Sequence, residues 1–217
     1  MPDWEERAAA ARARYEDGAR RLPDDADERQ RQLTRMGNAA WAAGLSVLML
    51  GRKPEAREWL VRAAETYRAS WADAPPGSWG RPIGAMKSRL IAEDFDGARA
   101  DARWALDAGA ASSDSPIGRY AGALAFLVLD EDAEAATLVP TLSDAEVIPP
   151  AVTSSLAALA TNAAAAYDEA IRALVADFEA REAYLEDTPV ADTVLALQAL
   201  AGRRDIVVWL ESRLLPS

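Results

Sequence analysis

Apolar residues recur at every third or fourth position along most of the chain, which is the spacing of amphipathic α-helices. No segment shows the sustained alternation of apolar and polar residues that indicates a half-buried β-strand. Prolines and glycines interrupt the pattern and separate the helices. The pattern predicts about eleven helices with short connectors, over residues 4–22, 28–50, 54–67, 82–91, 95–108, 116–129, 132–140, 151–166, 167–185, 190–201 and 205–215.

Local signals mark several of the predicted boundaries. Ser115 before Pro116 and Thr188 before Pro189 each place a capping residue ahead of a proline that suits the first helical turn. The segment PPGSWGRPIG, residues 75–84, is a break rich in proline and glycine. We expect Trp79 within it to fold back over the seam between two helix pairs. The alternative is that Trp79 and Arg81 project together as a binding anchor.

Small residues recur at matching positions in successive helix pairs, about 35 to 42 residues apart. In the first pair Gly44, Ala56 and Leu60 have the spacing at which a small residue lets two antiparallel helices approach closely. This pattern resembles the tetratricopeptide repeat over residues 37–215. The matching positions of the successive pairs are Ala56, Ala98, Ala135, Ala170 and Val207.

The resemblance implies an all-α superhelix of stacked antiparallel helix pairs, an α-solenoid. We expect one domain over residues 1–217, with an N-terminal helical segment at 1–36 and about five helix pairs over 37–215. The alternative is an irregular helical bundle in which the spacing of small residues is coincidental.

The resemblance also implies that the first helix of each pair lines an inner groove. The residues carried over to that groove are Asn38, Trp41, Leu45, Ile83, Lys87, Ile117, Tyr120 and Leu124. Such a largely apolar groove would suit an amphipathic helix or an extended peptide. The alternative is that neighbouring helices cover these residues, because residues 39–50 are apolar on nearly all sides.

Composition excludes several kinds of chemistry. The chain has no cysteine and no histidine, so disulfides, thiolate nucleophiles, zinc sites built on Cys or His, and a histidine general base are absent. The acidic run from Asp94 to Gly97 is too short for a calcium loop, and no glycine-rich phosphate loop occurs. We therefore expect no catalytic residue, no metal and no cofactor.

The net charge of the chain indicates which classes of partner to expect. The net charge of −11 disfavours nucleic acids and anionic membranes. Residues 1–18 are charged throughout and resemble no signal peptide, so we expect a cytoplasmic protein.

These features lead us to expect a non-catalytic scaffold that binds a protein or peptide in an apolar groove, with acidic rims that select basic partners. One alternative is an immunity or antitoxin protein that neutralises a basic toxin or effector. A further alternative is an enzyme that uses carboxylates. The candidate binding residues are Asn38, Trp41, Leu45, Trp79, Arg81, Lys87 and Tyr120.

Overall fold

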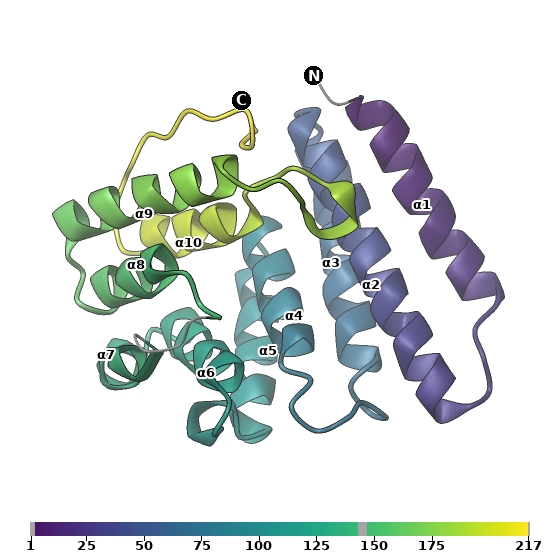
Figure 1. Cartoon of the computed structure of the whole chain (residues 1–217), viewed down its shortest axis with the longest axis horizontal. Helices are drawn as coiled ribbons and strands as arrows, with labels where there is room; N and C mark the ends of the chain where they lie inside the picture. The colour runs from purple at the N-terminus through teal and green to yellow at the C-terminus, as the bar shows by residue number, and fades with distance from the viewer. Residues whose placement is uncertain (1–2, 143–146, 217) are drawn as a thin grey trace.

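The computed structural model describes residues 3–142 and 147–216, which form ten α-helices, three short 3₁₀ helices and no strand. The all-α prediction is therefore confirmed for this part of the chain (Figure 1). The helices are α1 (Trp4–Arg20), α2 (Ala26–Met49), α3 (Lys53–Ala69), α4 (Gly80–Ile91), α5 (Phe95–Asp107), η1 (Ala110–Ser112), α6 (Pro116–Val128), α7 (Asp132–Leu138), η2 (Val139–Leu142), α8 (Pro150–Ala160), α9 (Ala164–Glu179), η3 (Leu185–Asp187) and α10 (Asp192–Gly202).

Aspartates cap three of the helices. The side chains of Asp3, Asp25 and Asp94 accept hydrogen bonds from the backbone N–H three residues later, at 3.0, 2.9 and 3.3 Å. The predicted cap at Ser115 is wrong in its detail, because its side chain makes no capping bond, although Pro116 does begin α6. The predicted start after Thr188 is also wrong, because α10 begins only at Asp192.

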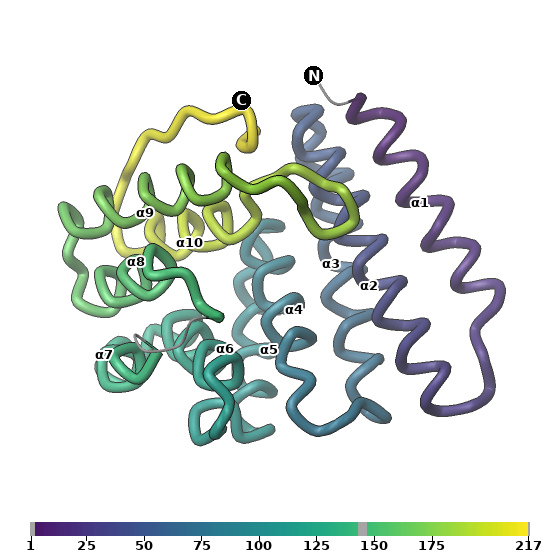
Figure 2. Tube along the Cα trace, in the orientation of Figure 1, coloured from purple at the N-terminus to yellow at the C-terminus, as the bar shows by residue number. Residues whose placement is uncertain are grey.

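Successive helices pack against one another from α1 to α9, and the last helix turns back. Figure 2 shows α1, α2 and α3 side by side, with α4 and α5 next to them and the remaining helices beyond. α10 packs chiefly on α4, and η3 packs on α2. The C-terminal third of the chain therefore covers helices that were expected to line an open groove.

Two apolar clusters form the core and meet at α4. The first is built mainly from α1, α2 and α3, and the second from α4 to α10. α4 belongs to both, because its Ala85 lies in the first cluster whereas Met86 and Leu90 lie in the second. This helix thus joins the N-terminal and C-terminal parts of the molecule.

The predicted last helix, residues 205–215, is wrong. The chain there runs without helix, with Ile206 and Leu214 buried and with Val207 and Trp209 exposed at 72% and 85%. Three consecutive β-branched residues, 206–208, lose rotamer freedom in a helix and favour this extended course. The fifth helix pair is therefore absent, since α10 has no second helix.

The two helices predicted over residues 151–166 and 167–185 are present but end about six residues earlier than predicted. α8 ends at Ala160, α9 ends at Glu179, and the chain then continues to α10 through residues 180–191, which we call the strap. Within the strap only η3 is helical. The strap crosses the front of α2 in the view of Figure 1.

Candidate functional site

A hollow of about 400 Å³ lies where α2, α3, α4, the strap and α10 meet. Five of the seven predicted binding residues line it, although they come from separate parts of the sequence. They are Asn38, Trp41, Trp79, Arg81 and Lys87. The hollow is also lined by Thr34, Tyr67, Gly77, Ser78, Gly80, Ile83, Gly84, Leu185 and Asp192.

Tyr67 forms the inner wall of the hollow and is fixed between two glycines. A Cβ atom at Gly37 would lie 2.7 Å from the Tyr67 ring, and one at Gly84 would lie 2.8 Å from it, so both positions exclude a side chain. The Tyr67 hydroxyl donates a hydrogen bond of 2.8 Å to Asn38 Oδ1. Burial, together with the charges of Asp192 and Glu186, raises the pKa of Tyr67, which keeps the phenol neutral.

Lys87 and Asp192 form an ion pair across the hollow. Both side chains are 14% exposed, and Lys87 Nζ also donates to Thr193 Oγ1 at 2.9 Å. The pair joins α4 to the first turn of α10, where a carboxylate is favoured by the helix dipole. Breaking it would leave a mostly buried charge without its partner.

Arg81 holds the turn between α3 and α4. Its Nε donates to Ser70 Oγ at 2.9 Å, and its guanidinium also bonds to the Gln30 side chain. Burial lowers the pKa of Arg81 from its ordinary value, which lies so high that the group remains charged. Arg81 thus ties the proline- and glycine-rich turn to α2 and to the end of α3.

Trp79 is buried, with 7% of its surface exposed, and does not project as a binding anchor. Its ring lies 5.6 Å from that of Trp71, and its Nε1 lies so close to Gly118 of α6 that a Cβ there would approach to 2.7 Å. The ring thus folds back against its neighbours, as expected, and packs between Trp71 and α6. One edge of the residue still contributes to the hollow.

The open apolar groove predicted from the resemblance is wrong. Leu45, Tyr120 and Leu124 are 0%, 9% and 1% exposed, so they belong to the core rather than to a binding surface. Burial, and secondarily the charge of Asp192, raises the pKa of Tyr120. Packing of η3 on α2, of α10 on α4, and of α8 and η2 on α6 covers these helices, while the hollow between α2, α4 and α10 stays open.

Tyr67, Leu185 and Asp192 are among the lining residues that were not predicted from sequence. Tyr67 was assigned to the apolar stripe of its helix, and its spacing gives no sign of the two glycines that receive it. Leu185 and Asp192 reach the hollow only because α10 returns to α4. No local pattern signals that return.

The chemistry of the hollow is suited to binding. Aromatic rings supply apolar walls, Lys87 pairs with Asp192, and Arg81 bonds to the side chains of Ser70 and Gln30. In residues 3–142 and 147–216 no three Asp or Glu side chains are grouped so as to hold a metal ion. Over the same residues no helix is long and apolar enough to cross a membrane. Comparisons with protein-family models, curated proteins and solved structures found no match.

Proposed function

We propose that the protein is a non-catalytic scaffold that binds a short segment of another polypeptide at the hollow between α2, α4 and α10. The observation that carries the proposal is the convergence of distant parts of the chain on one hollow with aromatic walls and fixed polar groups. Ligand sites combine these features, and about 400 Å³ lies at the lower end of their size range. Such a volume accommodates one or two side chains of a partner.

The packing of small residues supports a helical-repeat scaffold of the tetratricopeptide type. Ala56, Ala98 and Ala135 are at most 1% exposed, and Ala170 is 7% exposed. A Cβ at Gly44 would lie 2.7 Å from the Leu60 side chain, so this glycine permits the close approach of α2 and α3. These contacts match the role that the resemblance gives to small residues.

The state of the ionisable groups favours binding over catalysis. The raised pKa of Tyr67 makes it a poor base near neutral pH. The Lys87 ammonium is already engaged by the Asp192 carboxylate and by the Thr193 hydroxyl. The hollow carries both signs of charge, so it does not by itself favour a basic partner.

Site-specific crosslinking tests the proposal. A photoreactive benzophenone side chain in place of Ile83 would lie in the hollow, and one in place of the exposed Arg103 on α5 would serve as the matched control. In native extract we expect the hollow position alone to crosslink a distinct polypeptide, and Lys87→Met to weaken that crosslink.

Two outcomes would contradict the proposal. One is an equal crosslinking pattern at positions 83 and 103, which would indicate non-specific contact. The other is native mass spectrometry showing a stoichiometric small metabolite, with no polypeptide bound, which would favour a small-molecule site.

A further inference from the structure

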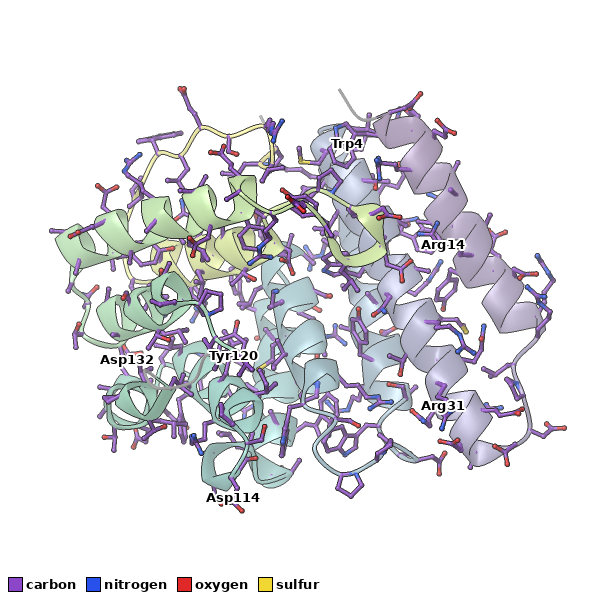
Figure 3. The ribbon with its side chains drawn as sticks, in the orientation of Figure 1. Trp4, Arg14, Arg31, Asp114, Tyr120 and Asp132 are labelled. Carbon is purple, nitrogen blue, oxygen red and sulfur yellow. The ribbon has the colours of Figure 1, made fainter. Side chains whose placement is uncertain are left out.

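The strap lies between α1 and the hollow and contacts both. Leu185 lines the hollow although 54% of its surface is exposed. Glu186 pairs with Arg14 of α1 at 3.2 Å, and Arg7 donates a hydrogen bond to the backbone carbonyl of Asp187. Figure 3 shows Arg14 on the side of α1 that faces η3. Leu185 thus lies at the hollow, the Glu186 carboxylate pairs with Arg14, and Asp187 is held through its backbone carbonyl. We call this place the seat of residues 185–187.

This part of the strap is loosely held. Arg14 and Glu186 are 48% and 25% exposed, and ion pairs so exposed contribute little to stability. A second hollow of about 330 Å³ separates η3 from α1, so the strap lies between two hollows. Few packed contacts therefore oppose its displacement.

The backbone of the strap is also strained. Glu186 and Asp187 both have φ of 52°, in the left-handed region that residues with a Cβ avoid. Two adjacent left-handed residues without glycine are an unfavourable backbone conformation. Displacement of η3 would release this strain.

Both ends of the strap are firmly anchored. The Tyr184 hydroxyl donates a hydrogen bond of 2.6 Å to the backbone carbonyl of Phe178. Val190 is 1% exposed and lies in the first apolar cluster, which is built mainly from α1, α2 and α3. Residues 185–187 can therefore leave their seat while α9 and α10 stay in place. Residues 185–187 are thus loosely held between the two anchored residues Tyr184 and Val190.

We propose that residues 185–187 occupy the place of a partner segment, and that the partner displaces them with a segment of the same chemistry: one large aliphatic residue followed by an acidic residue. This inference rests on the proposed function. The seat supports it, because Arg7 and Arg14 offer positive charge and the hollow offers the aromatic wall. The partner segment is thus acidic at this point, in contrast to the basic partner expected from net charge.

A peptide titration tests this inference without the natural partner. The probe is the acetylated and amidated peptide EAYLEDTP, residues 182–189, carrying a fluorophore. The receiving protein is the full chain with Leu185→Ser and Glu186→Ser, which removes the two side chains that occupy the seat. We expect saturable binding in fluorescence anisotropy. In the wild-type chain the apparent Kd should be about tenfold higher or more, if the strap is open for about a tenth of the time or less.

Matched variants separate specific from non-specific binding. In the double-variant background Arg14→Gln should weaken peptide binding about fivefold, as expected for loss of an exposed ion pair. Arg20→Gln, on the same helix and paired only locally with Asp17, should leave it unchanged. A peptide with Gln in place of Glu186 should bind more weakly. Equal binding to wild type and double variant, insensitivity to these charges, or no binding to a double variant with a native circular dichroism spectrum would each overturn the inference.

Hydrogen exchange provides a second measurement, which does not depend on folding of the double variant. In the native state the amides of Asp187 and Thr188 donate to the carbonyls of Tyr184 and Leu185 at 3.1 and 3.0 Å. Arg14→Gln should speed exchange of these two amides about fivefold and leave α10 unchanged. Unchanged exchange at both amides would show that this contact does not hold the strap, and would overturn the inference. Failure of the crosslinking experiment alone would instead contradict the proposed function.

Discussion

Replacing Asp101 with alanine removes a buried carboxylate that joins three helices. Asp101 of α5 is 1% exposed, and its two oxygens accept from Arg68 of α3 and from Arg89 of α4, each at 2.9 Å. Arg89 is itself only 14% exposed and also pairs with Asp94, the cap of α5. Burial alone would lower the pKa of Arg89, but the hydrogen bond to Asp94 and the charge of Asp101 raise it.

The expected cost follows from the burial of each partner. Removing one member of a buried ion pair typically costs about 3–5 kcal/mol. The loss here should lie toward the lower end of that range, because Arg89 keeps Asp94 as a second partner. The Arg89 contact supplies most of this loss, since Arg68 is 49% exposed and its pair is screened by solvent. For a chain of this size the loss corresponds to a Tm lower by about 6–20 °C. Asp101→Asn keeps one acceptor oxygen and should lose about 1–3 kcal/mol.

Urea unfolding followed by tryptophan fluorescence and circular dichroism measures the effect. Asp107→Ala is the matched control, because Asp107 lies at the exposed C-terminal end of the same helix and should change stability by less than about 0.5 kcal/mol. A loss below about 1 kcal/mol for Asp101→Ala would refute the reasoning. It would mean that the carboxylate contributes no more than a surface group does.

Other sites give further expectations. Gly37→Ala should lose about 1–3 kcal/mol despite the helix propensity of alanine, because the new Cβ would meet the Tyr67 ring, whereas Gly80→Ala has open space and should be neutral. Burial raises the pKa of three tyrosines, so unfolded tyrosines should ionise first as the pH rises. The free energy of unfolding should then be constant below about pH 9 and fall above about pH 10, by about 1.4 kcal/mol per pH unit for each tyrosine, and Tyr67→Phe should reduce that slope. Trp209→Ser should change stability by less than about 0.5 kcal/mol, since the ring is 85% exposed.

Each of these expectations has a result that contradicts it. Equal melting temperatures for the Gly37 and Gly80 variants would argue against the tight seat of Tyr67. An unchanged slope in urea unfolding between pH 9 and 11 would show that the Tyr67 phenol does not resist ionisation. A marked loss of stability for Trp209→Ser would mean that this ring is packed rather than exposed.

Local sequence signals predicted the helices well where polar capping residues and helix-breaking residues agree with the periodic spacing of apolar residues. Asp94 and Pro116 mark the starts of α5 and α6, and α2 and α3 lie within a few residues of their predicted bounds. The signals failed at residues 205–215, where apolar residues alone were taken for a helix although Ile206 begins a β-branched run. Contacts with earlier helices position this segment instead. For example, the Gln198 side chain of α10 donates a hydrogen bond of 2.8 Å to the backbone carbonyl of Val208.

The candidate site was predictable only in part, because it too depends on contacts between distant parts of the sequence. Asn38 and Lys87 were predicted because the resemblance places them on the first helices of two successive pairs, and both line the hollow. Asp192 lies 105 positions after Lys87 in the sequence, and the contact between them depends on how α10 returns to α4. Side chains brought together by such long-range packing carry no periodic signal.

The seat of Tyr67 between Gly37 and Gly84 makes this ring a gauge of the spacing between α2 and α4. An aromatic ring confined on both faces flips slowly, because each half-turn requires its neighbours to move apart. Spreading of the two helices would let the ring turn freely, whereas a shift confined to residues 185–187 would leave its motion unchanged. The rate of ring rotation would thus distinguish widening of the whole hollow from movement at its edge.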